Sequence, residues 1–216
     1  MTERKPYTVL VTGATGLIGS TLVERLLERD DGSLVIAAGR DLERMRRRFQ
    51  KHEENPRLRF VSYDAASAPS FDFAADAGVH AACSAHPRAY AQDPVGIMQA
   101  NLLGTMYLLE YVRSTGAARL IFLSTGEIYG DHPPREEGFR EDELGLVDTM
   151  APRACYPESK RAAETLCASY AAQYGVQAVV ARLCHVYGPT FTPSNSRADA
   201  QFIRKALAGE DIVLKS

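Results

Sequence analysis

The chain has 216 residues, of which 45% are hydrophobic, and a formal net charge of -2. This length and apolar content suffice for one sizeable core and exclude a disordered chain. The near-neutral charge gives no electrostatic basis for binding nucleic acid or an anionic membrane. The four cysteines form no C-x-x-C pair, and no apolar run approaches the roughly 20 residues that span a bilayer. We therefore predict a soluble, cytoplasmic protein with reduced thiols.

Short β-branched runs alternate with amphipathic stretches along the chain. The expected strands cover residues 7–11, 34–38, 58–62, 78–82, 120–124 and 178–182, and the expected helices cover residues 17–29, 42–51, 95–114 and 157–174. Parallel strands need crossover connections of this kind, with helices on both faces of the sheet. The predicted fold is α/β, with a doubly wound parallel sheet.

The pattern changes after Gly188. The stretch P-T-F-T-P-S-N-S-R is typical of a loop, residues 198–208 are expected to form a helix, and residues 211–215 read as the start of a strand. We predict one domain over residues 1–188 and the beginning of another segment over residues 189–216.

A glycine-rich turn, T-G-A-T-G-L-I-G, directly follows the first expected strand and opens the first helix. Glycine permits a tight turn and close approach of a pyrophosphate, which the helix amino end attracts. The alternative is a simple strand-to-helix turn. The predicted NAD(P)-binding residues of this turn are Gly13, Thr15, Gly16, Leu17, Ile18 and Gly19.

The choice between NAD and NADP depends on the end of the second strand, which reads A-A-G-R-D. Gly39 occupies the position where an acidic residue would bind the ribose of NAD, and Arg40 follows it. An arginine without a carboxylate favours the 2′-phosphate of NADP, whereas a slightly different turn would bring Asp41 within reach of the ribose. We predict NAD or NADP, with a slight preference for NADP. Asp64 is expected either to accept from the adenine amino group or to cap a helix.

Tyr156 and Lys160 are four residues apart in A-C-Y-P-E-S-K-R-A-A-E, so both can project from one face of a helix. A buried cation beside a phenol favours the phenolate and lowers its pKa, which suits a base near neutral pH. Taken alone, the same spacing also fits a surface tyrosine beside a solvated lysine.

Five motifs in order resemble the extended short-chain dehydrogenases/reductases of the sugar-nucleotide epimerase/dehydratase family. They are T-G-A-T-G-L-I-G, V-H-A-A-C-S-A-H-P, S-T-G-E-I-Y-G-D, Y-P-E-S-K and R-L-C-H-V-Y-G-P. The resemblance implies a Rossmann-type NAD(P)-binding fold over residues 1–188. It also implies that residues 189–216 begin a substrate-binding lobe that is mostly absent.

The resemblance implies roles residue by residue. Tyr156 looks like the base that deprotonates a sugar hydroxyl, and Lys160 like the residue that holds the cofactor ribose. Thr125 resembles the hydroxyl that bonds the reacting oxygen. Ser124 and Ala82 would border the cofactor.

The resemblance implies that Glu127 is a catalytic residue that also contacts the substrate, and its surroundings narrow the implied reaction. In 4,6-dehydratases the motif resembles T-D-E, but Gly126 stands here at the first acidic position, which disfavours dehydration. UDP-glucuronate decarboxylases resemble T-S-E-V-Y-G-D followed by P-R-A-C-Y, and this chain has T-G-E-I-Y-G-D and then P-R-A-C-Y. Tyr90 lies in the expected substrate loop. His185 stands where the family carries an asparagine that contacts the substrate's diphosphate.

The implied function is transient C4 oxidation of a nucleotide sugar, in a UDP-glucuronate decarboxylase or a 4-epimerase. The alternatives are a net NADPH-dependent carbonyl reductase and a non-catalytic cofactor-binding protein. A homodimer through the two long helices is expected from the resemblance. The histidines, cysteines and carboxylates show no metal-ligand spacing, so no metal is predicted.

Overall fold

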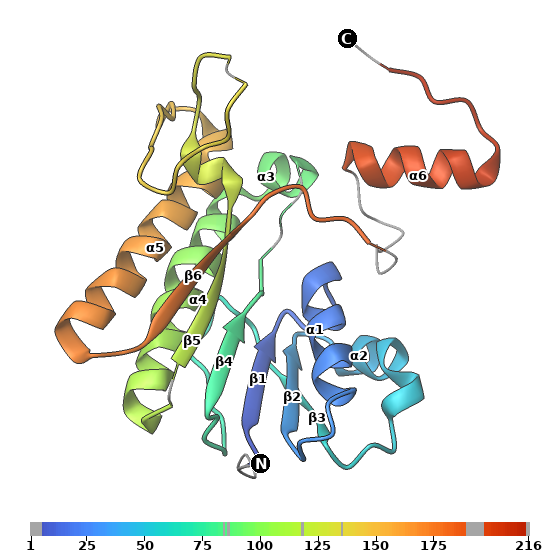
Figure 1. Ribbon diagram of the computed structural model, residues 1–216, viewed down its shortest axis with the longest axis vertical. Coiled ribbons are helices and arrows are strands. Elements are labelled where there is room, and N and C mark those ends of the chain that lie inside the picture. Colours follow the sequence, from blue (N-terminus) through green and yellow to red (C-terminus); the bar gives the residue numbers. More distant parts are fainter. Residues whose placement is uncertain are drawn as a thin grey trace.

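The computed structural model describes residues 6–83, 85, 87–117, 119–134, 136–188 and 197–214. These contain a sheet of six parallel strands in the order β3-β2-β1-β4-β5-β6 (Figure 1). The strands are β1 (Thr8–Thr12), β2 (Leu34–Gly39), β3 (Leu58–Ser62), β4 (Ala77–His80), β5 (Arg119–Thr125) and β6 (Ala178–Leu183). This topology confirms the predicted doubly wound α/β fold.

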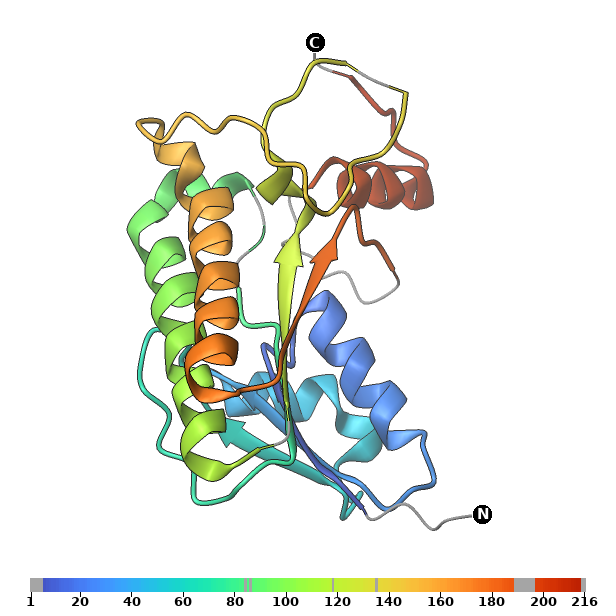
Figure 2. The same ribbon diagram turned by 60° about the vertical axis from the view of Figure 1, so that its left-hand side comes forward.

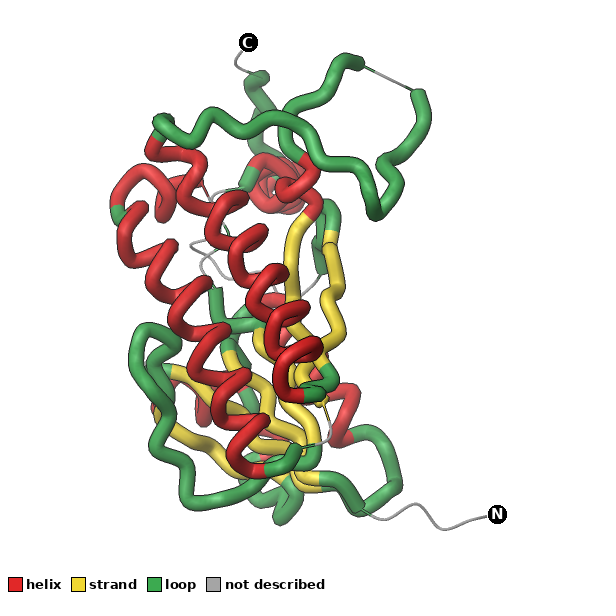
Figure 3. Tube along the Cα trace, turned by 90° about the vertical axis from the view of Figure 1, so that its left-hand side faces the viewer, coloured by secondary structure: helices red, strands yellow, loops and turns green. Residues whose placement is uncertain are grey.

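Helices cover both faces of the sheet (Figure 2). Helices α1 (Leu17–Leu27) and α2 (Leu42–Arg48) lie on one face, and α4 (Pro94–Thr115) and α5 (Cys155–Tyr174) lie side by side on the other (Figure 3). The central strands supply both cores because successive side chains point to opposite faces. In β2, for example, Val35 and Ala37 pack toward α1 and α2, whereas Ile36 and Ala38 pack toward α4 and α5.

Within the described part of the chain, three shorter helices lie at the carboxyl edge of the sheet: α3 (Pro87–Gln92), η2 (Gly126–Tyr129) and η3 (Pro152–Ala154). A fourth, η1 (Gln50–His52), joins α2 to the amino side of β3. Helix α6 (Ala198–Ala208) follows β6 and lies beyond this edge (Figure 1). Ala200 is the buried residue of α6. Among the helices of the described residues, none combines the length and apolarity that crossing a bilayer requires.

Several predicted boundaries differ from the structure by one to three residues, and one predicted strand does not form over its described residues. Helix α5 begins at Cys155, two residues before Pro157, because an amide in the first turn has no partner within the helix and proline therefore fits there. Strand β4 ends at His80, because the chain then leaves the sheet to pass the glycine turn. The strand expected at residues 211–215 is wrong for its described part, residues 211–214, which form no strand. The loop expected at residues 189–197 lies outside the described residues up to 196.

The order of the strands in the sheet determines where the candidate site lies. From β1 the chain runs outward through β2 to β3, then returns to β4 on the other side of β1 and continues to β6. Connections therefore leave the carboxyl ends of β1 and β4 in opposite directions and open a crevice between them. The glycine turn follows β1, and the candidate catalytic residues follow β5, next to β4.

Candidate active site

The glycine turn brings two backbone segments closer than any side chain would allow. Gly13 has φ +66°, and a Cβ there would lie 2.5 Å from the Ala81 carbonyl oxygen. A Cβ on Gly19 would collide with the Gly13 carbonyl oxygen. Gly16 caps α1 without a side-chain hydrogen bond, and the first turn of α1 carries no acidic residue. This cradle fits the pyrophosphate of a dinucleotide held at the helix amino end.

The close approach at Gly13 makes a testable prediction. Gly13→Ala is expected to lower the free energy of unfolding by about 2 to 4 kcal/mol, because backbone strain and a collision with Ala81 add together. Gly116→Ala is the matched control: Gly116 has φ +68°, and a Cβ there would meet nothing within 4 Å. The control should cost about 1 kcal/mol from strain alone. Urea unfolding measures both; equal losses would contradict the close contact.

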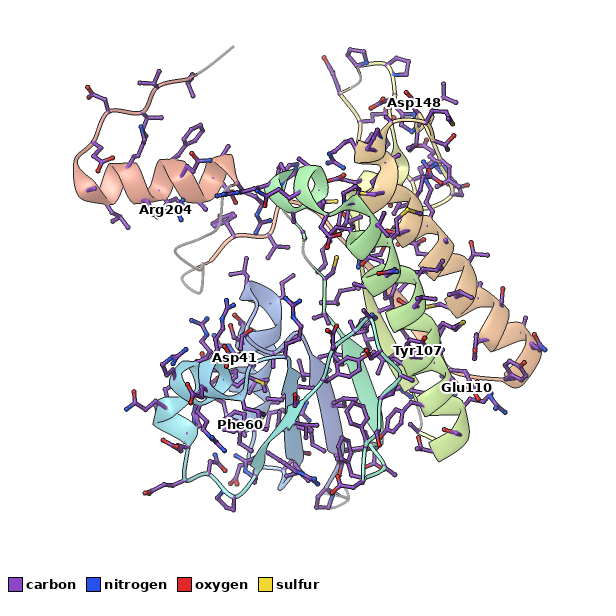
Figure 4. The ribbon with its side chains drawn as sticks, turned by 180° about the vertical axis from the view of Figure 1, so that it is seen from behind. Asp41, Phe60, Tyr107, Glu110, Asp148 and Arg204 are labelled. Atoms are coloured by element: carbon purple, nitrogen blue, oxygen red, sulfur yellow. The ribbon has the colours of Figure 1, made fainter. Side chains whose placement is uncertain are left out.

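The residues predicted to select the cofactor lie at the ends of β2 and β3. Arg40 is exposed, and the Asp41 carboxylate accepts from the Arg44 amide at 2.9 Å as the N-cap of α2 (Figure 4). Asp64 is exposed and accepts from the Ala66 amide at 3.0 Å. Both carboxylates thus cap local turns. Ala82 follows β4 beside Gly13, where the prediction placed a cofactor contact.

Tyr156 lies in the first turn of α5 and is 5% exposed. Its ring stacks on that of Tyr90 from α3, with centroids 4.8 Å apart and planes at 22°. Burial raises the pKa of Tyr156 above its usual range, the charge of Cys83 adds to the rise, and a hydrogen bond with Thr125 opposes it. The pKa lowering that the sequence led us to expect is therefore absent in this arrangement.

The position of Lys160 explains why the pKa of Tyr156 is not lowered. Its Nζ lies 5.9 Å from the centre of the Tyr156 ring, so the two residues do share a helix face. However, the ammonium donates to the Leu123 carbonyl of β5 at 2.7 Å and lies 4.5 Å from the centre of the Phe122 ring. Burial lowers the pKa of Lys160. Lys160 is therefore a buried cation anchored to the sheet, below the Tyr156 phenol.

The end of β5 carries the next two predicted residues. The Thr125 hydroxyl accepts a hydrogen bond from the Glu127 amide at 3.2 Å and so caps η2. The same side chain is a hydrogen-bond partner of Tyr156. Ser124 was predicted to border the cofactor, but its hydroxyl donates to Glu164 of α5 at 2.5 Å. Glu164 also pairs with Arg182 at 2.8 Å. The Ser124 hydroxyl thus belongs to a network that ties β5 and β6 to α5.

Arg153, for which the sequence suggested no role, lies between two predicted substrate residues. Its Nη2 is 2.7 Å from Glu127 Oε2, and its guanidinium carbon lies 4.5 Å from the centre of the Tyr90 ring. The only available signal was P-R-A-C-Y, because Glu127 is 26 residues away in the chain. Glu127, Arg153, Tyr90 and Tyr156 therefore form one connected group.

Gly126 lies against β6. A Cβ on Gly126 would be 2.5 Å from Cys184 Sγ, so the thiol occupies the space that a larger side chain would need. The next residue, His185, is exposed and has φ +44°. Histidine and asparagine both tolerate this left-handed conformation better than most residues, which explains how one can replace the other.

Two buried polar residues support the site from below. His80 Nδ1 lies 2.9 Å from Thr12 Oγ1, and burial and then the charge of Lys160 lower the pKa of His80 to about 3. Asn101 donates to Ser159 at 2.9 Å. The described residues contain no group of three histidines, cysteines or carboxylates that could hold a metal. His86, the histidine near the end of the V-H-A-A-C-S-A-H-P motif, lies outside the described residues.

Comparison with known proteins identifies the family. The profile of the NAD dependent epimerase/dehydratase family matches residues 9–216. The chain belongs to this family. It is 34% identical over 210 residues to UDP-glucuronic acid decarboxylase 6 of Arabidopsis thaliana, covering 96% of this chain and 59% of the relative. It is 32% identical to UDP-glucuronic acid decarboxylase 1 of Xenopus tropicalis, covering 99% of this chain and 49% of the relative. The chain thus spans about half to three fifths of these relatives.

Solved structures of the same family share the fold. UDP-glucuronic acid 4-epimerase from Bacillus cereus, in complex with NAD, superposes with a TM-score of 0.78 at 25% identity, covering 96% of this chain and 65% of that chain. UDP-glucose 4-epimerase from Thermus thermophilus, also with NAD, gives a TM-score of 0.76 at 30% identity with the same coverage. Both neighbours bind NAD.

Proposed function

We propose that this chain carries the cofactor-binding and catalytic part of a nucleotide-sugar enzyme that oxidises the sugar transiently at C4. The observation that carries the proposal is the meeting of Thr125 at the carboxyl end of β5, Glu127 in η2 and Tyr156 in the first turn of α5, with Lys160 buried beneath them. A reactive phenol, a hydroxyl and a carboxylate at one point are the groups that proton transfer at a sugar hydroxyl requires. The glycine cradle supplies the adjoining dinucleotide site.

Each residue has a proposed role. A nicotinamide cofactor in the cradle would accept a hydride from C4 of the sugar and later return it. Tyr156 removes the proton of the C4 hydroxyl, and Thr125 hydrogen-bonds the same oxygen. Lys160 supplies positive charge below the phenol, which favours the phenolate. Lys160 can favour the phenolate either while it keeps its hydrogen bond to the Leu123 carbonyl or after it gives that bond up.

The favoured reaction is decarboxylation of UDP-glucuronate. Once C4 is a ketone, the bond from C5 to the carboxylate breaks, carbon dioxide leaves, and the electron pair moves into the C4 carbonyl as an enolate. A proton then returns to C5, and re-reduction at C4 restores the alcohol. The relatives named UDP-glucuronic acid decarboxylase support this choice over 4-epimerisation. Gly126 provides no side chain at the position where dehydration uses its second carboxyl group, which weighs against dehydration.

A turnover experiment tests the proposal. The protein is incubated with UDP-glucuronate and, separately, UDP-glucose, and the products are analysed by mass spectrometry and chromatography. Decarboxylation predicts a product lighter by carbon dioxide from UDP-glucuronate and none from UDP-glucose. A product of unchanged mass and altered retention would indicate a 4-epimerase instead. Stoichiometric consumption of added NADPH would indicate a net reductase.

We also propose that the cradle admits NADP, although the structural neighbours hold NAD. Arg40 is exposed where β2 ends, and Asp41 is engaged in capping α2 rather than free to meet a ribose. Arg40→Ala is expected to weaken NADP binding about tenfold, the loss of one charged contact to a 2′-phosphate, while NAD binding stays unchanged. Calorimetric titration with each cofactor measures this. An equal effect on both cofactors would contradict the assignment.

We propose a homodimer formed through α4 and α5, in keeping with the sequence-based expectation. Helix α4 carries two exposed apolar side chains, Val95 and Met98, which are 66% and 43% accessible. By contrast, Ala163 of α5 is buried against the sheet and is unavailable to a partner. Light scattering at several protein concentrations decides between monomer and dimer.

A further inference from the structure

Three side chains from different elements, Tyr156, Tyr90 and Arg153, form one connected group. The Tyr156 ring stacks on Tyr90, and the Arg153 guanidinium carbon lies 4.5 Å from the centre of the Tyr90 ring. A guanidinium over a ring is attracted to the ring's electron-rich face. These contacts therefore link α5 through α3 to η3.

Arg153 also restrains Glu127. The ion pair between Arg153 and Glu127 has a nitrogen-to-oxygen distance of 2.7 Å, and the two side chains are 51% and 41% exposed. An exposed pair of this kind contributes little to stability. The pair does fix the orientation of a carboxylate that is otherwise attached to a short 3₁₀ helix.

The charge of Glu127 acts on the phenol. The negative charge of Glu127 raises the pKa of both Tyr156 and Tyr90, whereas the positive charge of Arg153 lowers the pKa of Tyr90. A guanidinium that neutralises Glu127 thus makes the phenolate less costly to form. The groups that face Tyr156 from the surrounding elements are Cys83 after β4, Tyr90 of α3, Thr125 of β5, Glu127 of η2 and Lys160 of α5.

We propose that Arg153 is a positioning residue of the active site, which orients the Glu127 carboxylate, supports the Tyr90 ring and offsets the carboxylate's charge near Tyr156. This inference rests on the proposed function, because it concerns the same site. It assigns Arg153 no contact with substrate.

The test compares Arg153→Met, Arg153→Lys and the control Arg140→Met. Arg140 also forms an exposed ion pair, with Asp142 at 3.2 Å, so the control removes one surface charge without touching the tyrosines. With UDP-glucuronate, Arg153→Met should lower kcat about tenfold, a typical coupling between neighbouring groups, and leave KM within about threefold. The acidic limb of the kcat profile should move up by about half a pH unit or more. Arg153→Lys should leave the acidic limb of the kcat profile at its wild-type pH, because lysine keeps the positive charge at this position.

A second measurement does not depend on turnover. The protein is labelled at the tyrosine ring carbons, and the resonances of Tyr90 and Tyr156 are assigned with phenylalanine variants. Both should shift in Arg153→Met and stay in place in Arg140→Met. A rise in KM at unchanged kcat would make Arg153 a substrate contact and overturn the proposal, as would unmoved resonances. If the wild type converts no UDP-glucuronate, the proposed function fails, and the resonances alone decide the role of Arg153.

Discussion

Tyr156→Phe is expected to lower kcat about a thousandfold with UDP-glucuronate, because the variant lacks the group that takes up the proton of the sugar hydroxyl. The phenylalanine ring keeps the apolar surface that packs against Tyr90, so the fold and the affinity for NAD should change little. Steady-state kinetics and calorimetric titration with NAD measure the two effects separately.

The matched control for this variant is Tyr170→Phe. Tyr170 lies on the same helix, and its hydroxyl reaches Glu110 of α4 at 3.4 Å, away from the glycine turn. Its loss should leave kcat unchanged. If Tyr156→Phe retained the activity of Tyr170→Phe, Tyr156 would not be the base and the proposed chemistry would fail.

Acid destabilisation through His80 is the second large expected effect. The pKa of His80 is about 3 in the folded protein, against 6.5 without the effects of burial, so the folded state keeps the imidazole neutral. The unfolded chain binds a proton below pH 6.5 and the folded chain does not. The stability that His80 contributes is therefore complete above pH 6.5 and falls as the pH drops toward 3.

Measured by urea unfolding, His80→Gln should remove this part of the pH dependence. Between pH 6.5 and pH 5, where most carboxylates stay ionised, the wild type should lose about 1.5 kcal/mol more than the variant. His52→Gln, in η1 outside the sheet, is the control and should keep the wild-type slope. Parallel slopes for wild type and His80→Gln would mean that the His80 imidazole takes up a proton in the folded state.

The fold was predictable because local pattern and global arrangement agree. The β-branched runs are short, the helical stretches between them are long enough for crossovers, and the glycines stand where β1 meets α1. The errors have local causes. Tyr90 was expected in a loop but lies in the short helix α3, and residues 211–214 read as part of a strand although no described strand pairs with them.

The site was less predictable because contacts between distant residues decide it. The spacing of Tyr156 and Lys160 correctly placed both on one helix face, but it carried no information about the Leu123 carbonyl, which takes the lysine's hydrogen bond. The Ser124 hydroxyl likewise turns toward Glu164, 40 residues away. The pair of Glu127 and Arg153 depends on how two short 3₁₀ helices meet.

The contact between Gly126 and Cys184 also constrains how this chain could be re-engineered. A designer who wanted an elimination catalyst would place an aspartate at position 126, and the thiol from the neighbouring strand end would stand in its way. An aspartate at position 126 therefore requires the exposed Cys184 side chain to rotate away, or a smaller residue at position 184. Libraries that vary the two positions together sample both ways of clearing this space.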